Sequence, residues 1–203
     1  ALMQTDIKRM FAYSSASHLS FISAGIFSLN SYGINGALYL IIAHAIATGA
    51  LFLLVGLIHE QTGFKTIKDL GGIAKKAPIF TFIFAVMLFA NIGLPGTNGF
   101  VSELLIIFGI YEFNHTLGYI SALTVIIGAS YMLWMFQRAI LQNRPEGSIE
   151  LKMRDLKIKE ILGLAPWVIL VFLMGFYPEV FMNKFEPTVT HYLNDILQIG
   201  ATK

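Results

Sequence analysis

One glutamate, Glu103, stands in a stretch from Ala77 to Tyr111 that contains no other charged residue. A carboxylate at the centre of a bilayer costs at least about 2.5–3.5 kcal/mol, so an acidic side chain there usually serves ion or proton movement. The preceding Leu94-Pro95-Gly96 cannot continue a regular α-helix. Membrane proteins use such breaks to free backbone polar groups at ion and proton sites. The pattern therefore predicts a protein that handles charge inside a membrane.

The fold class follows from runs without any charged residue, which cover 10–59, 77–102, 113–137 and 161–178. A spanning helix needs about 20 mainly apolar residues, so the first run can hold two helices, divided by turn-forming residues at 30–36. We expect an all-α membrane protein in which residues 1–181 form one bundle and 182–203 form an interfacial tail. The five expected spans are about 10–29, 36–58, 78–110, 115–137 and 161–181, with the third broken near Pro95.

Composition excludes several other kinds of protein. Only 13% of the residues are charged, whereas soluble domains have about 25%. The chain has no cysteine, which excludes iron–sulfur and zinc sites with thiolate ligands and any disulfide within it. A net charge of +2 is too small to indicate nucleic-acid binding. We therefore expect neither a cofactor nor a metal ion in this chain.

Lys and Arg residues alternate between the two ends of the expected bundle. The N-terminal segment, the 59–77 loop and the 138–160 loop carry two, four and six of them, whereas the turns at 30–36 and 111–114 carry none. Positive residues stay on the cytoplasmic side, so we expect a cytoplasmic N-terminus and an external C-terminus. The 138–160 loop could contain a short strand or an irregular amphipathic segment at 149–154. Because no initiator Met or signal-peptide pattern opens the chain, we expect it to begin inside a longer protein.

Glu103 is the strongest candidate for proton exchange. A second half-helix can begin near Asn98, which would place Glu103 close to the positive end of the helix dipole. Burial favours the neutral acid while the dipole favours the carboxylate, and a group under both influences can gain and lose a proton. The alternative is an ion pair that only joins helices.

His44 and His18 are candidate proton-relay residues within the second and first expected spans. A neutral imidazole both donates and accepts a hydrogen bond, so it can pass a proton. Small residues around His44 permit close helix approach or local unwinding. Serines just before His18 could hold water or bond to their own helix. For both histidines, a structural role between helices remains the alternative.

Several motifs, in this order along the chain, resemble the antiporter-like subunits of respiratory complex I. They are Gln4-Thr5-Asp6-Ile7-Lys8-Arg9, Ala12-Tyr13-Ser14-Ser15, Ser17-His18, Ala43-His44, Gly93-Leu94-Pro95-Gly96 and Gly99-Phe100-Val101-Ser102-Glu103. Glutamate at position 103, where the L- and N-type subunits and Mrp antiporter subunits typically have lysine, is similar to the M type, called subunit 4 in mitochondria.

The resemblance implies the C-terminal part of a fourteen-helix subunit of NADH:quinone oxidoreductase, in a bacterial inner membrane or its mitochondrial or plastid equivalent. It implies that Glu103 exchanges protons, that His18 and His44 line a hydrophilic axis, and that Pro95 and Gly96 form the helix break. Other membrane-arm subunits, lipid, water and protons are the expected partners, without direct contact to NADH, quinone or nucleic acid. The alternatives are an Mrp-type cation/proton antiporter subunit and a membrane-bound hydrogenase subunit. The family often has glycine where this chain has Ala45.

Overall fold

The computed structural model describes residues 1–144 and 152–201, which form an all-helical bundle with one isolated antiparallel bridge between Asp6 and Thr66. The possible strand at 149–154 falls partly outside the described residues, and 152–154 have no regular structure. The elements are α1 (Ile7–Phe27), α2 (Ser31–Thr62), η1 (Ile67–Asp69), α3 (Ile73–Lys76), α4 (Pro78–Asn91), α5 (Asn98–Phe113), α6 (His115–Phe136), the π-helical turn η2 (Gln137–Leu141), α7 (Ile158–Phe176), α8 (Pro178–Met182) and α9 (Glu186–Ala201).

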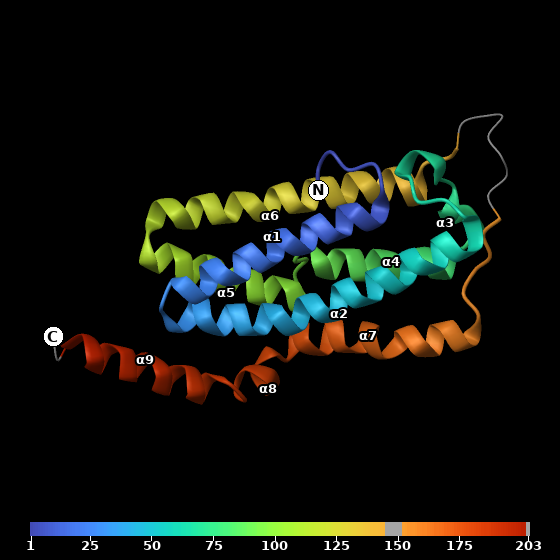
Figure 1. Cartoon of the computed structure of the whole chain (residues 1–203). Helices are drawn as coiled ribbons and strands as arrows, with labels where there is room; N and C mark the ends of the chain where they lie inside the picture. The colour runs from blue at the N-terminus through green and yellow to red at the C-terminus, as the bar shows by residue number, and fades with distance from the viewer. Residues whose placement is uncertain (145–151, 202–203) are drawn as a thin grey trace.

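Among the described residues, three stretches are long and apolar enough to cross a membrane, namely α2, α6 with η2, and α7. The other two expected spans are present as α1 and as the pair α4–α5, which run along the same direction of the bundle (Figure 1). An all-helical membrane protein is therefore confirmed, and the helix pair α4–α5 is interrupted between Asn91 and Asn98. That α1 and the pair α4–α5 cross the membrane as two of five spans remains a prediction. The interfacial position of residues 182–203, which contain α9, remains a prediction.

The prediction of a turn at 30–36 is wrong, because residues 31–36 form the first turns of α2. Asn30 is the N-cap and its Oδ1 accepts a 2.9 Å hydrogen bond from the backbone N–H of Gly33. Gly36 lies so close to α5 that an added Cβ would come 2.8 Å from the backbone nitrogen of Ile106. Gly36 thus allows α2 to pack closely against α5. The connection between α1 and α2 consists of Ser28 to Asn30.

The N-terminal polar patch begins α1 as expected. Oδ1 of Asp6 accepts hydrogen bonds from the backbone N–H groups of Lys8 and Arg9 at 2.8 and 3.1 Å, so Asp6 is the N-cap. The backbone N–H of Ile67 donates a 2.8 Å hydrogen bond to the carbonyl of Thr5. The start of α1 is thereby tied to the loop that follows α2.

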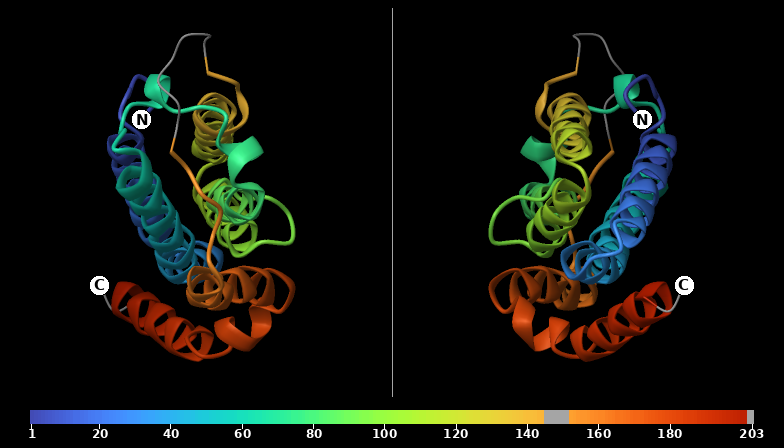
Figure 2. Two further views of the ribbon diagram at one scale, coloured as in Figure 1. Left: turned by 90° about the vertical axis from the view of Figure 1, so that its right-hand side faces the viewer. Right: turned by 90° about the vertical axis from the view of Figure 1, so that its left-hand side faces the viewer.

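The helices are arranged around the broken pair. α2 packs most extensively against α5 and also against α1. α7, α8 and α9 lie on the side of the bundle away from α6 (Figures 1 and 2). The hydroxyl of Tyr39 on α2 donates a 2.6 Å hydrogen bond to the carbonyl of Met174, which joins α7 to the bundle. At the break between α4 and α5, Leu94 and Pro95 are exposed on the outer side of the bundle.

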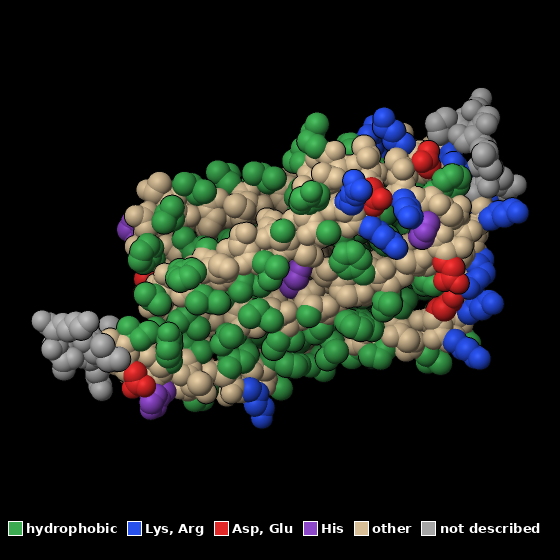
Figure 3. All heavy atoms as spheres, in the orientation of Figure 1, with side chains coloured by type: hydrophobic (Ala, Val, Ile, Leu, Met, Phe, Trp, Pro, Cys, Tyr) green, Lys and Arg blue, Asp and Glu red, His purple; other side chains and the backbone are tan. Residues whose placement is uncertain are grey.

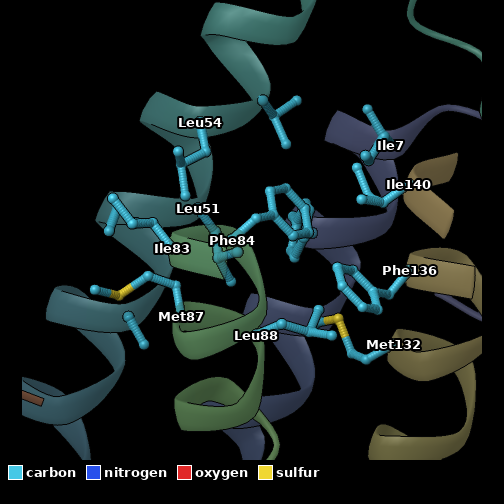
Figure 4. Close-up of a cluster of buried hydrophobic side chains, with 14 of the residues drawn as sticks. Ile7, Leu51, Leu54, Ile83, Phe84, Met87, Leu88, Met132, Phe136 and Ile140 are labelled. Atoms are coloured by element: carbon cyan, nitrogen blue, oxygen red, sulfur yellow. The ribbon is translucent and has the colours of Figure 1, made fainter. Parts of the chain in front are cut away.

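The apolar core surrounds α4. Phe84 lies at its centre, with ring centroids 6.3 Å from Phe11 on α1 and 5.9 Å from Phe136 on α6 (Figure 4). Leu51 and Leu54 of α2 complete this contact and are fully buried. Because lipid is as apolar as these side chains, close van der Waals packing holds such a core together inside a membrane. A second, smaller cluster of buried side chains joins α1, α2 and α5, and consists of Ile22, Ala37, Leu40, Ile106 and Ile110.

The outer surface divides into an apolar face and a charged end. Large hydrophobic side chains on α6 are exposed, including Tyr119, Leu123 and Ile126. Lys and Arg side chains gather at the end of the bundle near α3, where α2 ends (Figure 3). This distribution suits a protein surrounded by lipid whose basic end faces an aqueous phase.

Candidate functional site

The helix break lies between Asn91 and Asn98. Gly93 and Gly96 adopt φ values of +70° and +90°, which residues with a Cβ rarely adopt. Pro95, which lies between them, has no backbone N–H to donate. The hydroxyl of Thr97 donates a 2.7 Å hydrogen bond to the carbonyl of Leu94, which closes the turn before α5. The predicted interruption at Pro95 and Gly96 is confirmed.

Asn98 differs in detail from its predicted role as the cap of α5. The N-cap position is occupied by Thr97, and Asn98 is the first helical residue. Nδ2 of Asn98 instead donates a 3.3 Å hydrogen bond to the carbonyl of Ala43 on α2. The first turn of α5 is thus fastened to α2 next to His44.

Glu103 lies inside the bundle on α5 and is only 5% exposed. Its carboxylate rests against Gly93, and a Cβ added at that position would overlap Oε2. The left-handed turn at Gly93 therefore does two things, since it ends α4 and it leaves room for the carboxylate. The break and the acid, which the sequence suggested separately, form one structural unit.

The two candidate relay histidines meet at Glu103. Nδ1 of His18 on α1 lies 3.8 Å from Oε1 of Glu103, and the rings of His18 and His44 are 4.7 Å apart between centroids. Side chains from α1, α2 and α5 therefore converge on one point. α2 continues without interruption through His44, so the local unwinding considered for that helix is absent.

Two polar residues that the sequence analysis did not select complete this cluster. Nδ2 of Asn91, the last residue of α4, donates a 2.8 Å hydrogen bond to Oγ1 of Thr48 on α2. Oγ1 of Thr48 lies 3.1 Å from Nδ1 of His44. Asn91 and His18 line the same two small cavities, and both Thr48 and Asn91 are buried.

Sequence offered a signal for each of these two residues. Thr48 is one helical turn beyond His44, so its hydroxyl faces the same side of α2. Asn91 immediately precedes the break, where polar groups gather. Either position could have been selected on these grounds.

Two small cavities flank the carboxylate of Glu103. One, of about 10 Å³, lies between His18, His44, Asn91 and Gly99. The other, of about 30 Å³, extends from His18 and Asn91 to Ser14, Thr124 and Tyr131. A single water needs about 10–15 Å³ of such volume, so the two cavities have room for about one and two water molecules. Glu103 thus lies between the two cavities, of which the larger one has the more polar lining.

Tyr131 and Ser14 join α6 to α1 at the far side of the larger cavity. The hydroxyl of Tyr131 donates a 2.8 Å hydrogen bond to Oγ of Ser14, and both side chains are buried. Ser14 belongs to the serine cluster before His18, and this hydroxyl bonds to another helix rather than to its own. Within the described residues, no group of three or more His, Cys, Asp or Glu side chains is placed to hold a metal ion.

Most of the chain matches one family of membrane proteins. A family model described as "NADH:quinone oxidoreductase/Mrp antiporter, TM" matches residues 1–129, which is more than half of the chain. The chain belongs to this family. The match includes the helix break, both histidines and Glu103.

Within the NADH:quinone oxidoreductase/Mrp antiporter family, similar relatives are M-type subunits. NADH-quinone oxidoreductase subunit M of Rickettsia bellii is 38% identical over 193 residues, which cover 95% of this chain and 39% of the relative. NADH-ubiquinone oxidoreductase chain 4 of Marchantia polymorpha is 38% identical over 190 residues, covering 94% of this chain and 38% of the relative. The chain spans about two-fifths of the length of these relatives, and the resemblance to the M type is confirmed.

Solved structures share the fold. A chain of respiratory complex I from Thermus thermophilus superposes with a TM-score of 0.86 at 32% identity, over 95% of this chain and 40% of that one. A chain of the archaeal membrane-bound sulfane sulfur reductase gives 0.78 at 31% identity, over 91% and 30%. The Mrp complex from Dietzia gives 0.82 at 17% identity, over 96% and 44%, which is a likeness of fold alone.

Proposed function

We propose that this chain is the C-terminal part of a proton-translocating M-type membrane subunit of NADH:quinone oxidoreductase. The observation that carries the proposal is the position of Glu103, a buried carboxylate between two small cavities and 3.8 Å from an imidazole. Quinone reduction elsewhere in the complex would change the charge along the membrane arm. That change would alter the affinity of Glu103 for its proton.

The proton would pass between Glu103 and the histidine pair. His18 is near enough to Glu103 to exchange a proton directly or through one water, and His44 lies next along the path. Two imidazolium rings 4.7 Å apart would repel each other, so the pair would hold one proton at a time. This alternation favours transfer along the path over storage of charge.

The partners follow from the same proposal. Other membrane-arm subunits of complex I, lipid, water and protons would contact this chain, whereas NADH, quinone and the redox cofactors would bind elsewhere. The location would be a bacterial inner membrane or its organellar equivalent. The basic end seen in Figure 3 would face the cytoplasm or matrix.

An Mrp-type antiporter subunit or a hydrogenase-type subunit is the second candidate. The support for the antiporter is the family description, which names Mrp antiporters beside NADH:quinone oxidoreductase, and the fold shared with the Mrp complex. The fold shared with the sulfane sulfur reductase shows that such a chain also occurs in another membrane-bound redox complex. Glutamate at position 103 and the identity to M-type relatives favour the first candidate. Proton movement that requires NADH and quinone would support the first, whereas sodium/proton exchange without NADH would support the second.

The decisive experiment replaces Glu103 in the full-length subunit within the assembled complex. Glu103→Gln keeps size and hydrogen bonding but cannot titrate, so proton pumping and coupled quinone reduction should fall strongly while assembly survives. Glu103→Asp should keep part of the activity. Glu112→Gln is the matched control, because Glu112 lies exposed near the end of the same helix.

Two quantities are measured together, the membrane-arm content and the NADH-driven proton movement in vesicles. A purely structural ion pair predicts poor assembly of Glu103→Gln and normal turnover per assembled complex. Full pumping per assembled Glu103→Gln complex would overturn the proposal.

A further inference from the structure

A hollow lined by cationic and amide side chains lies at the basic end of the bundle, away from Glu103. We call it the basic hollow. Its volume is about 410 Å³, and its walls are Ile67, Lys68, Leu70, Arg138, Gln142 and Asn143. Two segments far apart in the sequence form it, and the backbone N–H of Gly72 donates a 2.8 Å hydrogen bond to the carbonyl of Gln142, which holds them together.

The polar groups of the basic hollow suit an anion. Lys68 and Arg138 are exposed at its walls, and the side-chain amides of Gln142 and Asn143 add hydrogen-bond donors. No acidic residue is among its lining residues within the part of the chain that the structure describes; Asp69, next to Lys68, is not one of them. An Arg guanidinium can donate two parallel hydrogen bonds to phosphate oxygens, and Lys adds a point charge.

The guanidinium of Arg138 is held in place by an aromatic ring. Its central carbon lies 4.6 Å from the ring centroid of Trp134, one helical turn earlier. Such a contact orients the planar cation while its N–H groups remain free to donate. Tryptophan is also typical of the depth at which lipid head groups begin. The helix widens there into the π turn Gln137–Leu141, a feature frequent at functional sites.

Apolar surface continues from the basic hollow along α6. Leu133, Trp134 and Leu141 are 42%, 42% and 47% exposed and lie beside Arg138 in the sequence. Ile67 and Leu70 form an apolar wall of the hollow itself. A free phosphate would use only the cations, whereas a phospholipid would place its phosphate against them and its acyl chains along this apolar surface. The combination of both surfaces indicates an amphiphile.

We propose that the basic hollow binds the phosphate of an anionic phospholipid from the leaflet at the basic end. Lys68 and Arg138 contact the phosphate, Gln142 and Asn143 donate to its ester or glycerol oxygens, and the acyl chains lie against α6. Basic pockets at helix ends on the cytoplasmic or matrix side are suited to anionic head groups. The site is separate from Glu103 and does not depend on the proposed movement of protons.

The test measures lipid binding to the complex that contains the full-length subunit. The purified complex is placed in phosphatidylcholine vesicles that contain spin-labelled phosphatidylglycerol, and the immobilised fraction of the label is recorded. Arg138→Gln and Lys68→Gln should each weaken the site by about five-fold, which is the effect of one basic residue near an anionic leaflet. Lys75→Gln is the matched control, because Lys75 is exposed at the same end but does not line the hollow.

Three outcomes would overturn the proposed lipid site. Unchanged immobilisation of phosphatidylglycerol in the double variant Lys68→Gln/Arg138→Gln would overturn the proposal. So would displacement of the label by inorganic phosphate at an ionic strength at which sodium chloride has no effect, since it would show a site that binds phosphate without the acyl chains. If the variants assemble poorly, the unaltered complex provides the second measurement. Its immobilised phosphatidylglycerol should fall with added salt while spin-labelled phosphatidylcholine stays constant, and a salt-independent signal would overturn the proposal.

Discussion

Asn91 donates a 2.8 Å hydrogen bond to Oγ1 of Thr48, which connects the last residue of α4 with the middle of α2. Because Asn91 occupies a lone pair of Thr48, the hydroxyl proton of Thr48 can be donated to Nδ1 of His44, 3.1 Å away. The bond thus links the end of the broken helix to the orientation of an imidazole in the proposed path. A movement of α4 would reach His44 through this contact.

Replacing Thr48 by valine should separate this role from packing. Thr48→Val keeps the shape of the side chain but leaves the buried Nδ2–H of Asn91 without an acceptor, at a cost of about 1–3 kcal/mol. We expect an assembled complex with reduced proton pumping and an altered dependence of its rate on pH. The measurement is NADH-driven proton uptake per assembled complex as a function of pH.

The matched control for this variant is Thr81→Val. Thr81 lies on α4 outside both cavities, and its hydroxyl donates a 2.9 Å hydrogen bond to the carbonyl of Ala77, the N-cap residue of the same helix. A Thr48→Val complex with the pH profile of Thr81→Val would show that the hydroxyl does not act on His44.

Gly93→Ala should disturb proton transfer more than assembly. The new methyl group would meet the carboxylate of Glu103, and alanine is unfavourable at φ +70°. Because the side chain of Glu103 can rotate away, we expect the complex to assemble at reduced yield and to pump poorly. Assembly is followed by the subunit content of purified membranes, and pumping by proton uptake in vesicles.

Gly56→Ala provides the comparison for this variant. Gly56 lies within α2 and nothing is within 4 Å of an added Cβ, so its replacement should leave both measurements near the wild-type values. Normal pumping by assembled Gly93→Ala complexes would contradict the idea that Gly93 positions Glu103.

Asp155 links the loop before α7 to the start of α4. Its carboxylate accepts hydrogen bonds from the backbone N–H groups of Ile79 and Phe80 at 3.0 and 2.8 Å, so it caps α4 from a distant part of the chain. Partial burial alone would raise the pKa of Asp155, but these bonds and one from the N–H of Leu156 outweigh it and hold the pKa below its usual value of 3.8. The cap therefore stabilises the fold in the ionised form.

Asp155→Ala should lower stability by about 0.5–2 kcal/mol, the usual effect of removing a helix cap. Because the pKa is lower in the folded state, the contribution is fully present above about pH 3.9, the unfolded value, and disappears as the pH falls through the folded pKa. The difference in thermal denaturation between wild type and Asp155→Ala should therefore be constant near neutrality and shrink in strong acid. A difference that grows on acidification would refute this role.

Local chemistry explains why the helix break could be predicted from sequence. Pro95 has no N–H and the flanking glycines accept positive φ, so the interruption depends on residues that lie within it. The prediction of a turn at 30–36 was wrong because the role of its glycines depends on residues outside that segment. Gly33 and Gly36 have the composition of a turn, yet their role is close contact with other helices, which only the assembled bundle reveals.

The candidate site was predictable only in part. Glu103 stands out because a charge in an apolar stretch is rare, and the two histidines because an imidazole within an apolar span can pass a proton. Their meeting point depends on the packing of α1, α2 and α5, for which spacing along the chain gives no measure. Thr48 and Asn91 were missed because Thr and Asn in apolar helices often bond only to their own backbone.

The histidine pair allows a test of whether His18 and His44 act as one path. We expect His44→Ala to reduce pumping partially, because water can occupy part of the space that the ring leaves. His18→Ala should have the larger effect, since His18 lies 3.8 Å from Glu103. If both rings serve the same path, the double variant should pump about as poorly as His18→Ala alone, because the effects of residues that act as a unit are not additive.

Proton uptake per assembled complex is measured for the two single variants and the double variant. His115→Ala is the control, because His115 stacks on Tyr111 at the far end of α5. Multiplicative losses in the double variant would assign the two histidines to separate paths, and unchanged pumping in all three would leave Glu103 to exchange its proton with water alone.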